Sequence, residues 1–304
     1  MTLRKVWAFV KLTRPLFLGG GVILNLLGVA LAASQGFSVD WVHVLLGQIL
    51  ITSIQLITHY VNEYYDYEVD RLIGDNRTPF SGGSGVLASG QLDRRVALRA
   101  MRVCMGIAIV ALILCGLQSP LMWIIGTLAL LGAYFYSAPP LSLMGSGWGE
   151  LNTAILTAFL VPLTGYVMQT GRFDPIVLML CLPFVLIYFA MVLTFEFPDY
   201  PADRAVGKRN IAVRLGLSNT ARLHNLLVVG GFGLMAIFIV LNRPVPAAQF
   251  VWLALPLAVW QVIGVMWRSR RGWRHFALLS GGAVALAGLV PVLWLIGFAF
   301  SLSS

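Results

Sequence analysis

Three oxygen-bearing side chains, Asn62, Asp66 and Asp70, recur at intervals of four in a polar stretch that ends an apolar run. In a continuous helix these positions lie on one face, with neighbouring Cβ atoms about 5–6 Å apart. Carboxylates held this close repel each other unless a cation lies between them. Mg²⁺ commonly takes one or two carboxylates together with phosphate oxygens of a substrate. We therefore interpret the stretch as a magnesium site that accepts a phosphate ligand; the alternative is a solvated acidic helix end.

A second acidic cluster begins at Glu196 and continues with Asp199 and Asp203, again four residues apart. Pro198 and Pro201 predict that no unbroken regular helix runs through it, although the two aspartates still converge if a proline begins a helix. Each cluster follows a long apolar segment. Together they would bind two metal ions that bridge one diphosphate.

Basic side chains stand next to both clusters. Lys208 and Arg209 follow the second, where Arg would bind phosphate oxygens as a fork and Lys as a point charge. Their alternative role is only to set membrane topology. Arg77 precedes the Gly/Ser-rich residues 81–85, whose backbone N–H groups are suited to an anion. This segment lacks the Gly-Lys-Ser/Thr ending of a Walker A loop, and a flexible turn is the alternative interpretation.

Other polar residues have weaker patterns. Glu150 follows the segment 136–140, Tyr-Ser-Ala-Pro-Pro, and an acid at a helix start often only compensates the helix dipole. His59 is a candidate base, although a lone histidine near a membrane edge is more often structural. The three cysteines fall in apolar runs, without disulfide or metal spacing.

The composition is that of a membrane protein, since 59% of the 304 residues are hydrophobic and 11% are charged. Soluble domains carry roughly 25% charged residues. The net charge of +9 does not indicate nucleic-acid binding, because the basic residues sit between apolar runs. The N-terminal segment does not match a cleavable signal peptide.

A membrane span needs about 20 mostly apolar residues, and this rule predicts about nine spans. They cover 16–33, 41–61, 103–118, 121–137, 151–169, 175–195, 223–241, 247–267 and 276–300. We expect an all-α, polytopic helical bundle that forms a single domain over residues 1–304.

The loops alternate in charge. If the N-terminus is inside, all but two of the 21 Lys and Arg residues, Arg172 and Arg243, lie on the inner side. The positive-inside rule therefore predicts an N-terminus inside and a C-terminus outside, in the inner or plasma membrane. Both acidic clusters then lie on the cytoplasmic face.

These motifs resemble those of the UbiA-type intramembrane prenyltransferases. The family's Asn-x-x-x-Asp-x-x-x-Asp motif is matched by Asn62, Asp66 and Asp70, and its Asp-x-x-x-Asp motif by Asp199 and Asp203. The run 207–216, Gly-Lys-Arg-Asn-Ile-Ala-Val-Arg-Leu-Gly, is similar to the run that follows the second motif, and Arg14-Pro15 also fits. Within the family the likeness is greatest to the 1,4-dihydroxy-2-naphthoate polyprenyltransferases of menaquinone biosynthesis. Glu196 departs from the pattern, because quinone-branch relatives often carry Asn there.

The resemblance implies transfer of a polyprenyl group from its diphosphate to an aromatic acceptor, in contact with membrane lipid. Mg²⁺ would be held by the four aspartates, with Asn62 as a neutral ligand and Arg77, Lys208 and Arg209 on the remaining diphosphate oxygens. Aromatic rings stabilise a developing allylic cation by roughly 0.5–2 kcal/mol each. The candidate rings, which are alternatively interfacial belt residues, are Tyr64, Tyr65, Tyr67 and Tyr136.

Several alternatives remain open at this stage. The same chemistry has other acceptors, namely 4-hydroxybenzoate, homogentisate, a chlorophyllide, haem or a glycerol-phosphate lipid. A membrane terpene cyclase uses no acceptor. A cation transporter also places acids in helices, but it more often buries them at mid-span.

Overall fold

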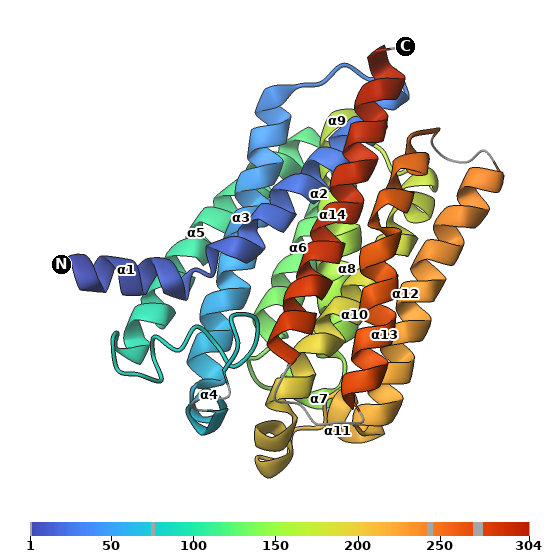
Figure 1. The fold of residues 1–304 in the computed structure, drawn as a ribbon. Helices are drawn as coiled ribbons and strands as arrows, with labels where there is room; N and C mark the ends of the chain where they lie inside the picture. Colours follow the sequence, from blue (N-terminus) through green and yellow to red (C-terminus); the bar gives the residue numbers. More distant parts are fainter. Residues whose placement is uncertain (1, 74–76, 242–245, 270–275, 304) are drawn as a thin grey trace.

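A computed structural model describes residues 2–73, 77–241, 246–269 and 276–303. These residues form helices and connecting loops without a strand, which confirms the all-α expectation. The long helices run side by side in one bundle (Figure 1). Four of the 21 Lys and Arg residues, Arg243, Arg270, Arg271 and Arg274, lie outside the described residues.

The elements follow the predicted spans closely. In the first half of the chain they are α1 (Leu3–Leu12), α2 (Pro15–Ser34), α3 (Trp41–Tyr65), α4 (Tyr67–Ile73), α5 (Arg94–Gln118), α6 (Leu121–Phe135), α7 (Leu143–Ser146) and α8 (Gly149–Ile155). A π-helical turn, η2 (Leu156–Leu160), then leads into α9 (Val161–Thr170). The second half holds α10 (Ile176–Ala205), α11 (Ile211–Leu215), α12 (Leu217–Val240), the 3₁₀ helix η3 (Pro246–Ala254), α13 (Leu255–Ser269) and α14 (Phe276–Ser303).

Eight segments within the described residues are long and apolar enough to cross a membrane, so the chain is a multi-pass membrane protein. The fourth predicted span, 121–137, corresponds to α6, an apolar helix of 15 residues that is shorter than a usual span. The short helices α4, α7 and α11 lie at one end of the bundle, and the C-terminus lies at the other (Figure 1). The assignment of these ends to the inside and the outside stays a prediction.

The expectation that prolines interrupt the second acidic cluster is wrong. Helix α10 continues through Pro198 and Pro201 to Ala205. A proline lacks an N–H, so Pro198 leaves the carbonyl of Thr194 without its helical donor. The hydroxyl of Ser280, on α14, donates to this carbonyl over 3.0 Å. Such substitute donors from neighbouring helices allow prolines inside membrane helices, and here the donor keeps the aspartates on a regular helix.

Close packing between α2 and α9 depends on small residues. A Cβ at Gly28 would meet the carbonyl oxygen of Pro162, and a Cβ at Gly165 would meet that of Asn25. Glycines at such contacts let two membrane helices approach at backbone distance. The three cysteines are buried and free, as predicted from their apolar surroundings.

Candidate active site

The first acidic motif spans a bend between two helices. Helix α3 ends at Tyr65, and α4 begins at Tyr67, with Asp66 at the junction. Backbone hydrogen bonds of 2.9 Å from Asp66 to Asn62 and from Asp70 to Asp66 preserve the four-residue spacing across the bend. The three motif residues therefore remain on one side of the chain, as the sequence predicts.

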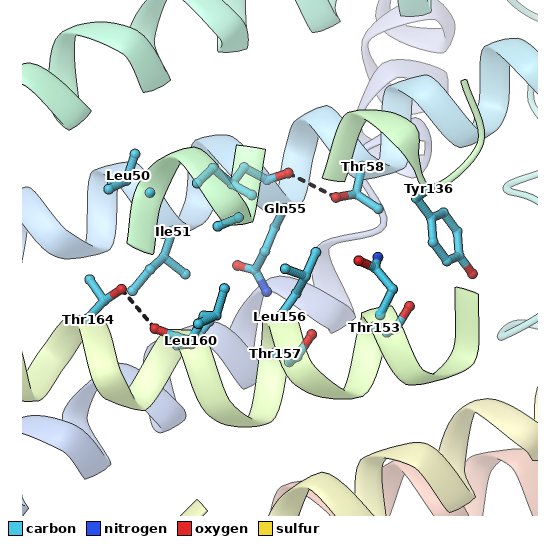
Figure 2. Close-up of a pocket in the computed structure, with 15 residues that line it drawn as sticks. Leu50, Ile51, Gln55, Thr58, Tyr136, Thr153, Leu156, Thr157, Leu160 and Thr164 are labelled. Atoms are coloured by element: carbon cyan, nitrogen blue, oxygen red, sulfur yellow. Dashed lines mark hydrogen bonds between the residues drawn. The ribbon is translucent and has the colours of Figure 1, made fainter. Parts of the chain in front are cut away.

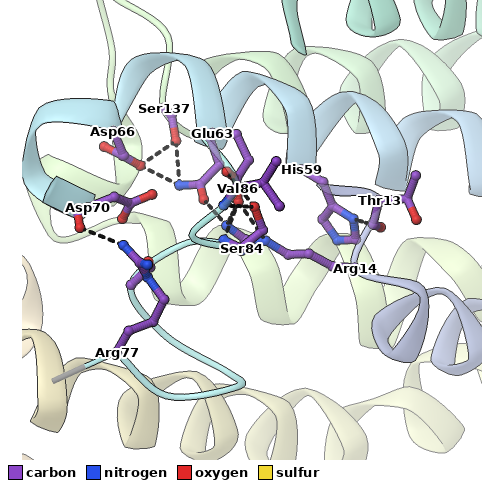
Figure 3. A network of polar contacts seen from close by, with 12 residues as sticks. Thr13, Arg14, His59, Glu63, Asp66, Asp70, Arg77, Ser84, Val86 and Ser137 are labelled. Atoms are coloured by element: carbon purple, nitrogen blue, oxygen red, sulfur yellow. Dashed lines mark hydrogen bonds and ion pairs between the residues drawn. The ribbon is translucent and has the colours of Figure 1, made fainter. Parts of the chain in front are cut away.

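Asn62 and Asp66 are joined directly. The Asn62 amide donates to Asp66 Oδ2 and, over 3.2 Å, to the Ser137 hydroxyl. That hydroxyl in turn donates to Asp66 Oδ2 over 3.1 Å (Figure 3). Ser137 follows α6, so this hydrogen-bond triangle ties the first motif to the segment between α6 and α7.

A largely buried ion pair between Arg14 and Glu63 also contacts the first acidic motif. Arg14, at the junction of α1 and α2, contacts Glu63 Oε1 at 2.6 Å and donates to Asn62 Oδ1 over 3.0 Å. The Ser84 hydroxyl donates to Glu63 Oε2 over 2.9 Å (Figure 3). Glu63 therefore links the N-terminal helices to the Gly/Ser-rich segment and satisfies its own buried charge.

The Gly/Ser-rich segment lies over both acidic motifs. The Gly82 N–H donates to Asp199 Oδ2 over 3.1 Å, and a Cβ at Gly83 would collide with Asp70 Oδ2. Both glycines have positive φ, +76° and +70°, which non-glycine residues adopt only with strain. The backbone can approach the two carboxylates this closely because these positions are glycine.

Arg77 holds this segment in place. Its guanidinium donates to the carbonyl of Asp70 over 2.7 Å and to the carbonyl of Gly82 (Figure 3). Both partners are backbone oxygens, so Arg77 fastens the loop to α4 in this structure. Its predicted contact with a diphosphate stays a prediction.

Lys208 joins the two motifs. Its Nζ lies 3.5 Å from Asp66 Oδ1 and 3.3 Å from Asp203 Oδ1, and its side chain is only 11% exposed. Burial lowers the pKa of Lys208, but the Asp66 and Asp203 carboxylates outweigh this and raise the pKa above its usual value. Two carboxylates that are 137 positions apart in the sequence therefore share one cation at the same end of the bundle.

The segment that carries Lys208 is also anchored. Asn210 donates to Asp203 Oδ2 over 2.8 Å, and the backbone N–H of Arg209 donates to the carbonyl of Gly145 over 2.8 Å. The Arg209 side chain is exposed. Of the two cations predicted in this segment, Lys208 contacts the acids and the Arg209 side chain lies at the surface.

The site has the electrostatics of a cation site. Burial raises the pKa of Asp70 to about 8; the Arg14 guanidinium opposes this shift, and the carboxylates of Glu63, Asp66 and Asp199 add to it. Asp199 Oδ1 is buried without a hydrogen-bond partner among the described residues. Buried carboxylates of this kind are stabilised by a bound cation.

The oxygen donors of the two acidic motifs fit an Mg²⁺ ion that is shared with a substrate. No ready-made group of three acidic, His or Cys side chains occurs in the described part of the chain. Mg²⁺ does not require one, because it usually completes its shell with water and substrate phosphate oxygens. The hard oxygen donors on the two motifs, Asn62, Asp66, Asp70, Asp199 and Asp203, suit that arrangement.

A cavity of about 70 Å³ adjoins the acidic site, between α3, α6 and the α8–η2–α9 segment (Figure 2). Its deeper wall is apolar and includes Leu50, Ile51 and Leu160. Gln55 and Thr157 point into it (Figure 2). The Gln55 Oε1 atom is buried without a hydrogen-bond partner among the described residues. The cavity therefore combines an apolar end with an unsatisfied hydrogen-bond acceptor.

Tyr136 connects the cavity with the acids. It lines the cavity, and the adjacent residue Ser137 is bonded to Asp66.

A sequence profile described as "UbiA prenyltransferase family" matches residues 22–281. The chain belongs to the UbiA prenyltransferase family. This membership confirms the resemblance seen in the motifs and makes the protein a prenyltransferase, in place of the cation transporter considered from the sequence.

Relatives in the UbiA family support this assignment over most of the chain. The 1,4-dihydroxy-2-naphthoate octaprenyltransferase of Escherichia coli (strain K12) is 25% identical and covers 85% of each chain. The enzyme of the same name from Bacillus subtilis (strain 168) is 24% identical over 81% of this chain and 83% of its own. Protoheme IX farnesyltransferase of Photorhabdus laumondii subsp. laumondii is 26% identical over 83% of this chain and 81% of its own.

The fold matches a solved UbiA homologue from Archaeoglobus fulgidus bound to GPP and Mg²⁺. The TM-score is 0.66 at 17% identity, over 98% of this chain and all of the other. An apo UbiA homologue from Aeropyrum pernix K1 gives the same TM-score at 14% identity, over 92% of this chain and 97% of the other. These likenesses concern the fold.

The tyrosines suggested from the UbiA resemblance separate into two groups. Tyr64 and Tyr67 pack on Arg94, whose Cζ lies 4.3 and 5.4 Å from the ring centroids. Tyr65 packs edge-on against Tyr64. Of the four candidates, Tyr136 lines the cavity.

His59, considered from the sequence either as a base or as a structural residue, contacts the backbone in this structure. Its Nδ1 lies 2.8 Å from the carbonyl oxygen of Thr13, at the turn between α1 and α2. The contact supports the junction that carries Arg14.

Sequence reasoning did not identify the roles of Glu63 and Ser137. Glu63 stands within the first motif but outside its four-residue spacing, so periodicity gives it no partner. Ser137 is adjacent to the Pro-Pro segment that the family resemblance already marked, and that position is the signal that would have found it.

Proposed function

We propose that this UbiA-family protein transfers a polyprenyl group from polyprenyl diphosphate to an aromatic acceptor in the membrane. The observation that carries the proposal is the position of Lys208, in contact with Asp66 of one motif and Asp203 of the other. A diphosphate at this place meets a cation and two sets of carboxylates from distant parts of the chain.

The metal in this proposal is Mg²⁺, held by Asn62, Asp66, Asp70, Asp199 and Asp203. When bound, it neutralises charge on the departing diphosphate as a Lewis acid. The chain's own cations complete the neutralisation: Lys208 turns from its carboxylate partners to the phosphate oxygens as a point charge. Arg77 and the exposed Arg209 are the further diphosphate contacts that we propose.

The cavity beside Tyr136 takes the reacting end of the substrates. Its apolar wall excludes water, which would otherwise capture an allylic cation. The Tyr136 ring, at the boundary between cavity and acids, is suited to stabilise positive charge by about 0.5–2 kcal/mol. The unsatisfied Gln55 Oε1 is suited to accept a hydrogen bond from an acceptor hydroxyl.

Among acceptors we propose 1,4-dihydroxy-2-naphthoate, which would place the enzyme in menaquinone biosynthesis in the inner or plasma membrane. Two relatives with long coverage carry the name 1,4-dihydroxy-2-naphthoate octaprenyltransferase. A ring with two hydroxyl groups also supplies donors for Gln55 and Thr157. This naphthoate would lose its carboxylate when the ring is prenylated.

The experiment uses purified protein with Mg²⁺, labelled polyprenyl diphosphate and a panel of acceptors: 1,4-dihydroxy-2-naphthoate, 4-hydroxybenzoate, homogentisate, haem, a chlorophyllide and glycerol-phosphate lipid. Mass spectrometry identifies the products, and a cyclised hydrocarbon without acceptor would indicate a terpene cyclase. We expect the naphthoate adduct.

Site variants test the diphosphate centre in the same assay. Asp66→Ala and Asp199→Ala are expected to abolish transfer while folded protein remains in the membrane. Glu68→Ala is the matched control, because this acid lies next to the motif with its side chain 72% exposed. Near-full activity of both aspartate variants would contradict the proposed metal site.

A further inference from the structure

Two glutamates remain without a role in the proposed reaction. Glu150 lies in the first turn of α8 and Glu196 lies in α10, and both are buried, with 2% and 8% of their surface exposed. Buried carboxylates are unfavourable unless they are hydrogen-bonded or paired. The contacts that these two make therefore indicate what they do.

Both carboxylates bind the same short segment of backbone. Glu150 Oε1 accepts a hydrogen bond from the Ile211 N–H over 2.7 Å, and Glu196 Oε2 accepts one from the Ala212 N–H over 2.9 Å. The side chain of Asn210 accepts the next N–H, from Val213, over 2.9 Å. The first N–H groups of a helix have no partner within it, and here three side chains provide those partners.

This anchored segment leads directly back to Lys208. The Lys208 N–H donates to the carbonyl of Asp203 over 3.0 Å, and the Arg209 N–H donates to Gly145. The Asn210 amide donates to Asp203 Oδ2. Consecutive residues from 208 to 212 are therefore each held by a hydrogen bond, and the last two of these bonds come from Glu150 and Glu196.

The two hydrogen bonds provide a firm connection because an N–H group that loses its acceptor away from water is unfavourable. They also come from two different helices, α8 and α10, so the backbone that carries Lys208 is hydrogen-bonded to both of these helices. Loss of either bond would remove one of the anchors that connect the Lys208 segment to α8 and α10.

We propose that Glu150 and Glu196 are positioning residues that fix Lys208 between the two acidic motifs. Neither is assigned to touch the substrate. The inference deepens the proposed function and rests on it in one respect, that Lys208 binds the diphosphate. The hydrogen bonds themselves can be tested without that assumption.

The first measurement is amide hydrogen exchange of the detergent-solubilised full chain, followed in peptides that cover residues 208–213. Glu196→Leu and Glu150→Leu remove the acceptors, and we expect exchange in this segment to accelerate at least tenfold. Thr194→Val is the matched control, because among the described residues this buried α10 hydroxyl donates within its own helix, to Met191 O. It is expected to leave exchange of residues 208–213 unchanged.

The second measurement separates binding from chemistry. In Glu196→Leu we expect KM for polyprenyl diphosphate to rise about tenfold, as the loss of one buried hydrogen bond allows, while KM for the acceptor stays constant. Glu196→Gln keeps an acceptor oxygen and is expected to recover most of the affinity. If the leucine variants do not fold, Glu196→Gln and Glu150→Gln are compared with the wild type, and a smaller acceleration of exchange is expected.

The possible results are distinguishable. Unchanged exchange in residues 208–213 for all four variants overturns the inference, whatever their activity. Accelerated exchange with unchanged diphosphate KM overturns the positioning role, provided that Lys208→Met raises that KM. If Lys208→Met leaves the KM unchanged, the proposed diphosphate contact is wrong, and the positioning role is rejected with it even where the hydrogen bonds are verified.

Discussion

Replacing Lys208 with methionine removes the one cation seen to contact both acidic motifs within the described residues. The side chains of Lys208 and its two partners are largely buried, at 11% exposure for Lys208, 13% for Asp66 and 3% for Asp203. Methionine keeps most of the volume and none of the charge. The variant therefore isolates the electrostatic contribution of the bridge.

The expected loss of stability is large in the absence of divalent ions. Removing one partner of a buried ion pair costs about 3–5 kcal/mol, because a charge is left uncompensated. Partial exposure of Lys208 and Asp66 favours the lower value, about 3 kcal/mol. At a concentration 100 times its dissociation constant, a ligand adds about 2.7 kcal/mol. Mg²⁺ with pyrophosphate stabilises both proteins in this way, but it stabilises the wild type by more, because Lys208 is the proposed diphosphate contact. The difference in stability should therefore widen.

The assay follows thermal unfolding with a thiol-reactive dye. Cys104, Cys115 and Cys181 are buried and free, so they react as the protein unfolds. Without divalent ions we expect the Lys208→Met midpoint to fall by about 6–12 °C, and Mg²⁺ with pyrophosphate to widen the gap. Arg204→Met is the matched control, since it removes an equal charge from an exposed position near the site.

Two results would refute this reasoning. The first is a Lys208→Met midpoint equal to that of the wild type without divalent ions, which would mean that the bridge contributes no stability. The second is a gap that does not widen when Mg²⁺ and pyrophosphate are added, which would mean that Lys208 does not contribute to diphosphate binding.

Three further variants probe other contacts. Ser280→Ala removes the hydroxyl from its α10 carbonyl and should cost about 1–3 kcal/mol, seen as a lower unfolding midpoint with unchanged activity per folded molecule; an unchanged midpoint would contradict this. Gly83→Ala should displace Asp70 and weaken Mg²⁺–pyrophosphate binding measured by calorimetry. The control Gly90→Ala has a similar φ of +73° with open space around it and should bind normally. Gln55→Leu should raise KM for the acceptor and leave KM for the diphosphate unchanged; equal effects on both would remove Gln55 from the acceptor site.

The sequence predicted the convergence of the two motifs for a physical reason. Apolar runs of span length and the bias of Lys and Arg place the ends of several helices on one side of a membrane. Asn62, Asp66 and Asp70 keep helical spacing through local hydrogen bonds, so their grouping is a property of the nearby chain. Lys208 was predicted beside them for its charge alone.

Other features depend on contacts that no local pattern contains. The continuity of α10 through Pro198 requires Ser280, which is distant in the sequence and located on α14. The roles of Glu63 and Glu196 likewise depend on Arg14 and on the Ala212 N–H, which reach them only after the bundle has formed. Spacing rules describe one helix at a time and therefore do not predict these pairings.

The unbroken α10 also determines the depth of the reaction relative to the lipid. Its 30 residues extend about 45 Å at 1.5 Å per residue, whereas the hydrocarbon core is about 30 Å thick. Asp199 lies near the far end of this rod, beyond the length that the acyl chains require. If the donor is the proposed polyprenyl diphosphate, we expect its charged head to remain at the level of the lipid headgroups while its isoprenoid tail stays among the acyl chains, so that it reacts without leaving the leaflet.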